Sequence, residues 1–336
     1  MATTINDQIY RDQIRRRAML SLYERRLVRN LDNVLSNLNK KFVTVARTNG
    51  ITPAILVTYN REIRRAYRRV YSLGFTEFER LYASEGKFAV SQINRSLTNI
   101  YEARKLTGIN VRDLLIRDNK NLAGHLASIS SSQRRIVSNL VRNGLSSSLS
   151  NNQIIGNIRR QGSSLARSQV ATLARTSITQ VANDASDTIY RLNDDVIKGY
   201  QYVATLDGRT SIICGRLDGR VFSLDSGFKP RPPQHFGCRS TTIPVVKSAG
   251  AIDKVQGNRR INKRNLRNIT EARRASINGA VPARTTYPEW LATQDNEIKL
   301  NLLGSQSRVA LFNEGNLTLT QFSNRDGKLL SLERLD

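Results

Sequence analysis

The sequence predicts an α+β protein that is predominantly helical, with long N-terminal helices, a small α+β middle domain and a short helical C-terminal subdomain. Three patterns lead to this fold class. Apolar residues recur at helical spacing over residues 1–143, side chains alternate in the manner of a strand over 199–204, and short helical runs return after residue 286. A chain of 336 residues with 39% hydrophobic residues has enough apolar surface for a core in each part.

The basic helical domain, residues 1–143, opens with a long helix expected over residues 4–48. Its predicted buried stripe is Leu27, Leu31, Leu35, Leu38, Phe42 and Val45. Asn49-Gly50 ends this helix and Thr52-Pro53 starts the next, because a hydroxyl can cap a first turn in which proline needs no acceptor. We expect the second helix to end near residue 73, a third to span 76–105, and shorter helices to form near 111–117 and 120–142.

The middle domain is expected over residues 144–247, after the polar tract that follows Asn143-Gly144. Ser150 is a candidate cap for a short helix that ends near Gly162, and a longer helix should run over 163–193. The period then changes to that of a strand at 199–204. Asp218-Gly219 is typical of a tight hairpin turn, and the β-branched run 241–246 is expected to pair with the first strand.

The remaining chain divides into a basic arm over residues 248–285 and a C-terminal subdomain over 286–336. Residues 251–285 carry nine basic and two acidic side chains, which indicates an extended or loosely helical arm. The last fifty residues regain apolar content, and Gly304, Gly315 and Gly327 mark their expected turns. Trp290 is interpreted as the packing anchor of this subdomain, with a partner contact as the alternative.

The charge balance points to a polyanionic partner. The chain has 53 Lys and Arg against 27 Asp and Glu, a formal net charge of +26. Nucleic acid is the first candidate, because each neutralised phosphate releases condensed counterions, and an anionic membrane surface is the second. We expect no membrane span and no secretory signal, since no apolar run is long enough for either. Two cysteines fit a reducing cytoplasm.

Candidate nucleic-acid contacts lie on the second helix and in the arm. On the helix, five arginines share one face opposite the apolar stripe: Arg61, Arg64, Arg65, Arg68 and Arg69. We call them the arginine ridge. In the arm, the candidates are Arg259, Arg260, Lys263 and Arg264. Arginine suits phosphate through its forked donors, and the alternative for each group is a solvated surface.

A candidate metal site lies in residues 204–246, which contain both cysteines and one of the two histidines. Cys214, His235 and Cys238 are soft ligands, and His-x-x-Cys lets two side chains converge on one tetrahedral ion such as zinc. Asp207, Asp218 or water would complete the shell. Two alternatives stay open: a Cys214–Cys238 disulfide formed once the protein leaves a reducing compartment, and a metal-free core in which His235 bonds a backbone carbonyl.

The other residues selected in this region have structural interpretations. Arg209 and Arg239 are expected to tie loops together through carboxylates such as Asp207, in preference to binding DNA. Asp218 and Gly219 form the turn described above. Catalysis finds little support, because the chain has no Gly-rich phosphate loop, no helical His-x-x-x-His and no nucleophile motif around either histidine. The sequence therefore favours a protein that is not an enzyme.

An ordered series of motifs resembles the tailed-phage minor head protein family, which is defined by the Mu F-like head morphogenesis domain. The matching elements are Gly144 to Arg160, Ala174-Arg175-Thr176, Gly199 to Ala204, Asp207-Gly208-Arg209-Thr210, Leu217-Asp218-Gly219-Arg220-Val221-Phe222 and Arg231 to Ser240. The tail motifs Tyr287-Pro288-Glu289-Trp290-Leu291, Leu302-Leu303-Gly304 and Leu317-Thr318-Leu319 resemble longer members of that family.

This resemblance implies a structural assembly protein of the virion, present in few copies inside the capsid or at its neck. Its expected partners are the portal protein, the major capsid protein and packaged double-stranded DNA, which it would contact without reading sequence. A homo-oligomer around the portal is also expected. Two other functions stay open: an encapsidated effector such as a metal-dependent nuclease built on Cys214, His235 and Cys238, and an internal protein ejected with the genome.

Overall fold

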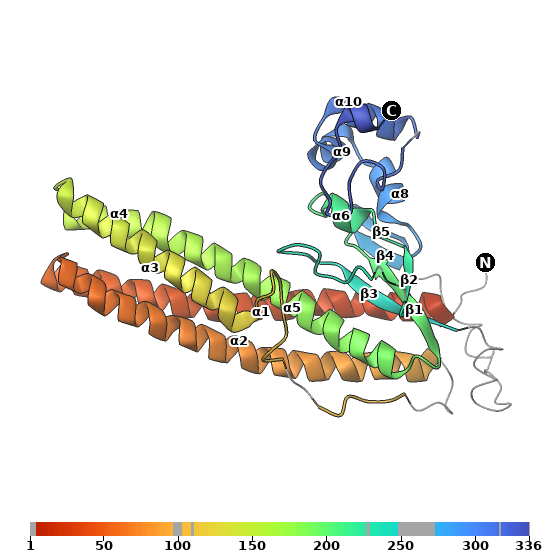
Figure 1. The fold of residues 1–336 in the computed structure, drawn as a ribbon, viewed down its shortest axis with the longest axis horizontal. Coiled ribbons are helices and arrows are strands. Elements are labelled where there is room, and N and C mark those ends of the chain that lie inside the picture. Colours follow the sequence, from red (N-terminus) through yellow and green to blue (C-terminus); the bar gives the residue numbers. More distant parts are fainter. Residues whose placement is uncertain are drawn as a thin grey trace. The chain divides into compact units, whose positions relative to one another are not determined.

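The computed structural model describes residues 5–96, 103–108, 111–225, 227, 229–247, 273–315 and 317–335. These residues form two compact units. One unit, the helical unit, consists of residues 20–82 and 108–181. The other, the sheet unit, consists of the described residues within 1–19, 83–107 and 182–336. The fold is the expected one, predominantly helical with a small antiparallel sheet in the middle of the chain (Figure 1).

The helical unit is built from parts of α1 (Ile5–Asn49), α2 (Pro53–Ser96) and α5 (Ser164–Leu192), together with α3 (Leu122–Ser146) and α4 (Asn151–Asn157). α1 ends as predicted, because Gly50 has a φ of 71° that continues no helix. The predicted stripe of α1 is buried except at Val45, which is exposed and is replaced in the core by Ala46. Phe42 of α1 and Tyr59 of α2 meet with ring centroids 4.2 Å apart.

α2 corrects the predicted break near residues 73–76. It is one continuous helix to Ser96, and Gly74 lies inside it. A Cβ at Gly74 would meet the Leu122 side chain at 3.4 Å, so this glycine serves the close approach of α3 and not a turn. The helix predicted near 111–117 is also wrong, because these residues form bends that lead to an isolated bridge between Arg117 and Lys120.

The helix that was expected to end near Gly162 does not end there. α4 begins with the predicted Ser150 cap, in which Ser150 and Gln153 form a reciprocal capping box. It then continues through one π-helical turn, η1 (Ile158–Ser163), directly into α5. A Cβ at Gly162 would lie 3.0 Å from Val137 of α3, so the glycine permits close packing without interrupting the helix.

The sheet unit contains a three-stranded antiparallel sheet in the order β2-β1-β3: β1 (Ile197–Val203), β2 (Val221–Ser223) and β3 (Thr241–Val246). The predicted pairing of the first strand with 241–246 is confirmed. The end of α5 packs on this sheet, where Asn183 accepts a hydrogen bond from the backbone of Thr242. Its core includes Tyr190, Tyr200, Tyr202 and both cysteines.

The C-terminal part of the sheet unit has its own core around Trp290, which is 2% exposed. It consists of α8 (Tyr287–Ala292), α9 (Asn296–Leu303), α10 (Gln306–Asn313) and the 3-10 turn η3 (Leu332–Arg334). Gly304, Gly315 and Gly327 all have positive φ, as their predicted turns require. Residues 273–282, which we had placed in the basic arm, form the hairpin β4 (Arg273–Ser276) and β5 (Gly279–Pro282).

Candidate functional site

The two cysteines and His235 come together in the sheet unit. Cys214 lies on the short helix α6 (Ile212–Gly215), while His235 and Cys238 lie at the ends of a four-residue turn that precedes β3. The amide of Cys238 donates to the carbonyl of His235 at 3.2 Å and closes this turn. Gly237 has a φ of 76°, which only glycine adopts readily, so the turn depends on that residue.

The donor atoms of this Cys–His–Cys cluster are close to one another. The Sγ of Cys214 is 3.4 Å from Nε2 of His235 and 3.6 Å from Sγ of Cys238. All three donor atoms lie within 4.8 Å of one another. Both cysteines are buried and neither is in a disulfide, whereas His235 is half-buried.

The histidine is held in a defined orientation. Its Nδ1 lies 2.9 Å from the carbonyl oxygen of Phe236. Because a carbonyl only accepts, Nδ1 carries the proton of the neutral ring and Nε2 is left with a lone pair toward Cys214. The backbone carbonyl that we expected His235 to bond is therefore present, and the bond leaves Nε2 available as a ligand atom.

Cys214 is surrounded by hydrogen-bond donors. The hydroxyl of Tyr202 donates to its Sγ at 3.3 Å. The hydrogen bond from Cys238 lowers the pKa of Cys214 to about 6, although burial opposes ionisation, and bonds from Ser240 and Tyr202 act in the same direction. The contact with Cys214, together with burial, raises the pKa of Cys238. The cluster thus favours one thiolate, on Cys214.

The carboxylate of Asp207 contacts two arginines and lies outside the Cys–His–Cys cluster. Its carboxylate accepts two bonds from the guanidinium of Arg239, one of them at 2.7 Å, and a third from the amide of Arg209 at 3.0 Å. The side chain of Arg209 is 84% exposed and lies 4.0 Å from the carboxylate. The expected tie between loops is therefore made by Arg239, while Arg209 contributes mainly its backbone.

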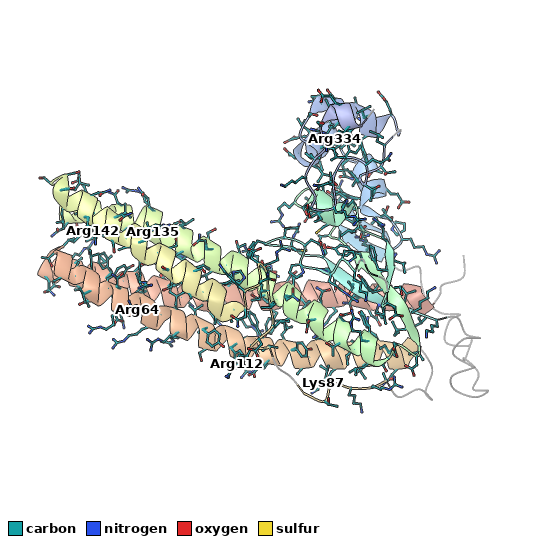
Figure 2. The ribbon with its side chains drawn as sticks, viewed as in Figure 1. Arg64, Lys87, Arg112, Arg135, Arg142 and Arg334 are labelled. Atoms are coloured by element: carbon teal, nitrogen blue, oxygen red, sulfur yellow. The ribbon has the colours of Figure 1, made fainter. Side chains whose placement is uncertain are left out.

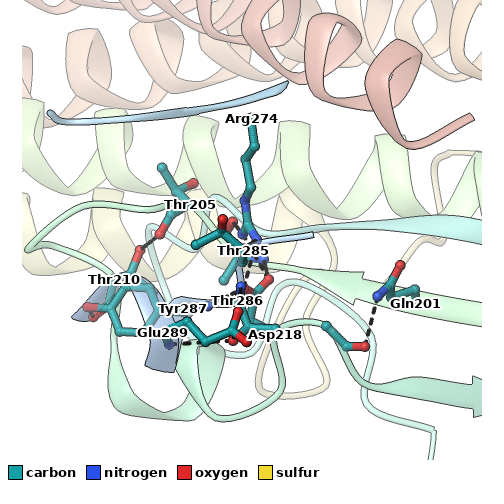
Figure 3. Close-up of polar contacts among 11 residues, drawn as sticks. Gln201, Thr205, Thr210, Asp218, Arg274, Thr285, Thr286, Tyr287 and Glu289 are labelled. Carbon is teal, nitrogen blue, oxygen red and sulfur yellow. Dashed lines mark hydrogen bonds and ion pairs between the residues drawn. The ribbon is translucent and has the colours of Figure 1, made fainter. Parts of the chain in front are cut away.

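Asp218 is the centre of a second, buried polar cluster (Figure 3). Its carboxylate accepts from the amides of Ala204 at 2.7 Å and Tyr287 at 2.6 Å. It also accepts two bonds of 2.9 Å from the guanidinium of Arg274. Gly219 follows with a φ of 77° and donates its amide to Tyr202. Through these hydrogen bonds, the carboxylate of Asp218 joins segments that are distant in the sequence.

Arg274 is an important residue of this buried cluster that the sequence did not single out. It was one of many basic side chains in the predicted arm, yet it is 2% exposed and also donates to the carbonyls of Thr285 and Ala204. The Tyr202 hydroxyl was missed as well. The only local signal for Arg274 is its place four residues before Asn278-Gly279, a typical turn pair, inside a short β-compatible stretch.

The arginine ridge is exposed on α2, as predicted. Arg65 pairs with Glu62 at 2.6 Å. For Arg61, Arg64, Arg68 and Arg69 no ion pair is observed with the part of the chain that the structure describes. Figure 2 labels Arg64 on α2 and Arg135 and Arg142 on α3, which are also exposed within the helical unit. Arg259, Arg260, Lys263 and Arg264 lie outside the described residues.

The remaining candidates are structural. Trp290 is buried and packs against Tyr287 with ring centroids 5.2 Å apart, as expected of a packing anchor. No described helix combines the length and the apolar character that a membrane crossing requires.

Taken together, the fold and the cluster define a small α+β domain organised around a Cys–His–Cys turn, continuous with basic helices. Residues 135–243 match the family model described as Phage Mu protein F like protein. This part of the chain is therefore similar to the Mu F-like family of phage head proteins. Comparisons with curated proteins and with solved structures gave no match. The matched segment ends before residue 286, so the resemblance of the C-terminal tail stays a prediction.

Proposed function

We propose that this chain is a minor head protein that attaches to the portal at the inner capsid and contacts packaged double-stranded DNA through its basic helices. Its major-capsid contacts and a ring of copies around the portal belong to the same proposal. The similarity of residues 135–243 to a phage head family supports a role in head assembly and in the virion. The observation that carries the DNA contact is the unbalanced charge of the helical unit.

That unit has 22 Lys and Arg against 7 Asp and Glu. Four of the acidic residues are already paired inside the unit, for example Asp32 with Arg167 and Glu24 with Arg175 at 2.8 Å. Most of the cations therefore lack an acidic neighbour, and their repulsion opposes a compact bundle. Phosphates of a nucleic acid would neutralise them and release counterions, without reading the base sequence.

DNA retention as a function of salt tests this contact. We expect log K to fall linearly with log salt, with a slope of about −0.9 for each neutralised phosphate. A triple variant of the ridge, Arg61→Gln, Arg64→Gln and Arg68→Gln, should bind more weakly and lower the magnitude of the slope by roughly two to three. The chain should leave plasmid DNA intact in the presence of divalent metal ions, as a non-enzymatic protein would.

A matched control removes three exposed cations from the sheet unit: Lys198→Gln, Lys328→Gln and Arg334→Gln. If DNA contact is specific to the ridge, this control keeps the parental slope. Equal losses in both variants, or an affinity that does not change between low and moderate salt, would contradict the proposal.

A cavity of about 500 Å³ in the sheet unit is a candidate docking surface for the portal. It is lined by Leu206, Gly208, Arg209, Ile277 and Ile298, among others. Ile277 is 66% exposed and the Arg209 side chain 84% exposed, so an apolar side chain and a cation both line this open cavity. An apolar portal side chain next to a carboxylate would complement both.

Binding to purified portal tests this surface. Ile277→Asp and Arg209→Glu should each weaken binding by about tenfold or more if they form the centre of the contact. Leu332→Asp introduces the same charge at another exposed apolar position and should bind normally. Portal binding that survives both cavity variants places the contact elsewhere, and no portal binding at all contradicts the proposed function.

A further inference from the structure

We propose that Cys214, His235 and Cys238 bind one zinc ion, with a fourth, exchangeable position filled by a ligand from outside the chain. The site would fasten α6 to the turn before β3, independently of how the chain contacts DNA or portal. Side chains that can donate a lone pair to zinc are concentrated at one place in the fold. The chain has two cysteines and two histidines in 336 residues, and three of these four side chains meet in one place.

Two of the three distances between the donors match the edges of a zinc tetrahedron. Zinc binds thiolate sulfur at about 2.3 Å and imidazole nitrogen at about 2.0 Å, which gives edges of roughly 3.8 Å between two sulfurs and 3.5 Å between sulfur and nitrogen. The observed values are 3.6 Å between Cys214 and Cys238 and 3.4 Å between Cys214 and His235. The third pair, Nε2 of His235 and Sγ of Cys238, lies within 4.8 Å, so rotation of these side chains toward each other would complete the three protein ligands of one ion.

The surroundings of the donors are those of a ligand set. The carbonyl of Phe236 holds Nδ1–H of His235, and this contact aims the Nε2 lone pair at the cluster. The hydroxyl of Tyr202 donates to Cys214 and would stabilise a coordinated thiolate. Two thiolates and a neutral imidazole also cancel the double charge of the ion, which a buried site requires.

The chemistry of the donors selects among metals. Two sulfurs and one imidazole favour zinc over magnesium and calcium, which prefer oxygen ligands. The candidate fourth ligands Asp207 and Asp218 are engaged by Arg239 and Arg274, and neither belongs to the cluster. Among the described residues no fourth ligand joins the cluster, and in this proposal water or a group from a partner fills the position.

Metal analysis of the full chain, produced without a metal-affinity tag and kept reduced, tests the proposal. We expect about one zinc per chain and two thiols that react after denaturation. The cobalt-substituted protein should show sulfur-to-cobalt charge-transfer bands and the d–d bands of a tetrahedral ion. Addition of cyanide should shift these d–d bands, because the fourth position is exchangeable.

Two ligand variants and a control keep the test specific. Cys238→Ser and His235→Gln should each weaken zinc binding by about tenfold to a hundredfold or more. His125→Gln changes the other histidine, in the helical unit, and should keep full zinc content. Circular dichroism verifies that each variant is folded. The zinc content of the parent chain tests the proposal even if a variant does not fold.

Two results would overturn the inference. A reduced parent chain that binds no zinc and gives no cobalt charge-transfer band, while retaining both thiols, would establish a metal-free core. A chain that loses 2 Da and both free thiols without binding zinc, even when purified in reductant, would establish a Cys214–Cys238 disulfide.

Discussion

Arg274 and Asp218 are 56 residues apart in the sequence, and their side chains form a buried ion pair with two hydrogen bonds of 2.9 Å. The side chains are 2% and 0% exposed. Asp218 belongs to the turn before β2 and Arg274 to the hairpin before α8, so the pair joins the C-terminal core to the sheet (Figure 3). The amide of Tyr287 completes this junction by donating to Asp218 at 2.6 Å.

Breaking this pair should strongly destabilise the sheet unit. In Arg274→Met the Asp218 carboxylate stays buried without its cation, which costs about 3–5 kcal/mol of unfolding free energy. Trp290 is the single tryptophan of the chain and lies in the C-terminal core, so its fluorescence during urea unfolding measures the change.

Arg209→Met is the control, because it removes an exposed arginine of the same unit. Its unfolding free energy should stay within about 0.5 kcal/mol of the parent value. A parental urea midpoint for Arg274→Met would mean that the junction is held by Tyr287 and the backbone bonds alone.

The Asp207–Arg239 pair should make stability depend on pH. Burial by itself would raise the pKa of Asp207, but the hydrogen bonds and charge of Arg239 and the amide of Arg209 outweigh it and lower the pKa below its ordinary value of 3.8. A carboxyl whose pKa is lowered in the folded state stabilises the fold above the unfolded pKa. This contribution is lost as the pH falls from about 4 through the folded pKa.

Urea unfolding of the parent and of Asp207→Asn, at pH values from 7 down to 3, measures this effect. The difference in stability between the two proteins should be largest at neutral pH and should shrink below about pH 4. Asp225→Asn removes an exposed carboxylate and should follow the parent at every pH. A parent–Asp207→Asn difference that is constant with pH would contradict the assignment.

Gly199 should tolerate no side chain. A Cβ at this position of β1 would lie 2.3 Å from the carbonyl oxygen of Phe222 in β2. Because that oxygen belongs to the backbone, Gly199→Ala must displace the strand pairing and should cost about 1–3 kcal/mol of unfolding free energy. At Gly227 nothing lies within 4 Å of the added Cβ, so Gly227→Ala should leave the urea midpoint unchanged. Equal midpoints for both variants would contradict the close approach of β1 and β2.

Trp290 should be the largest single contributor to the C-terminal core. It is 2% exposed and contacts Tyr287, so Trp290→Ala leaves a cavity and should cost about 3–5 kcal/mol. Hydrogen exchange at the amides of α8 to α10 measures the loss, and Trp290→Phe should retain most of the protection. Leu332→Ala, at an exposed position, should keep parental exchange rates. If Trp290→Ala does the same, the stability of the C-terminal core does not depend on this side chain.

Helical periodicity predicted most of the N-terminal half, since each helix needs only a local pattern of apolar residues. The stripe of α1 and the ridge of α2 follow directly from spacings of three and four. The predicted helix break at Gly74 was wrong, because a glycine can either end a helix or leave room for a neighbouring side chain. Gly74 leaves room for Leu122, a contact that no local pattern encodes.

The same distinction holds for the candidate site. The sequence by itself determined which donors are available and the turn that places His235 near Cys238, because spacing and a glycine of positive φ are local properties. Only the tertiary structure decided that Cys214 joins them, that Asp207 belongs to Arg239, and that Arg274 serves a buried carboxylate and not DNA. These contacts join segments that are distant in sequence, and they form because burial of a charge or a thiol is favourable only where folding brings its partner.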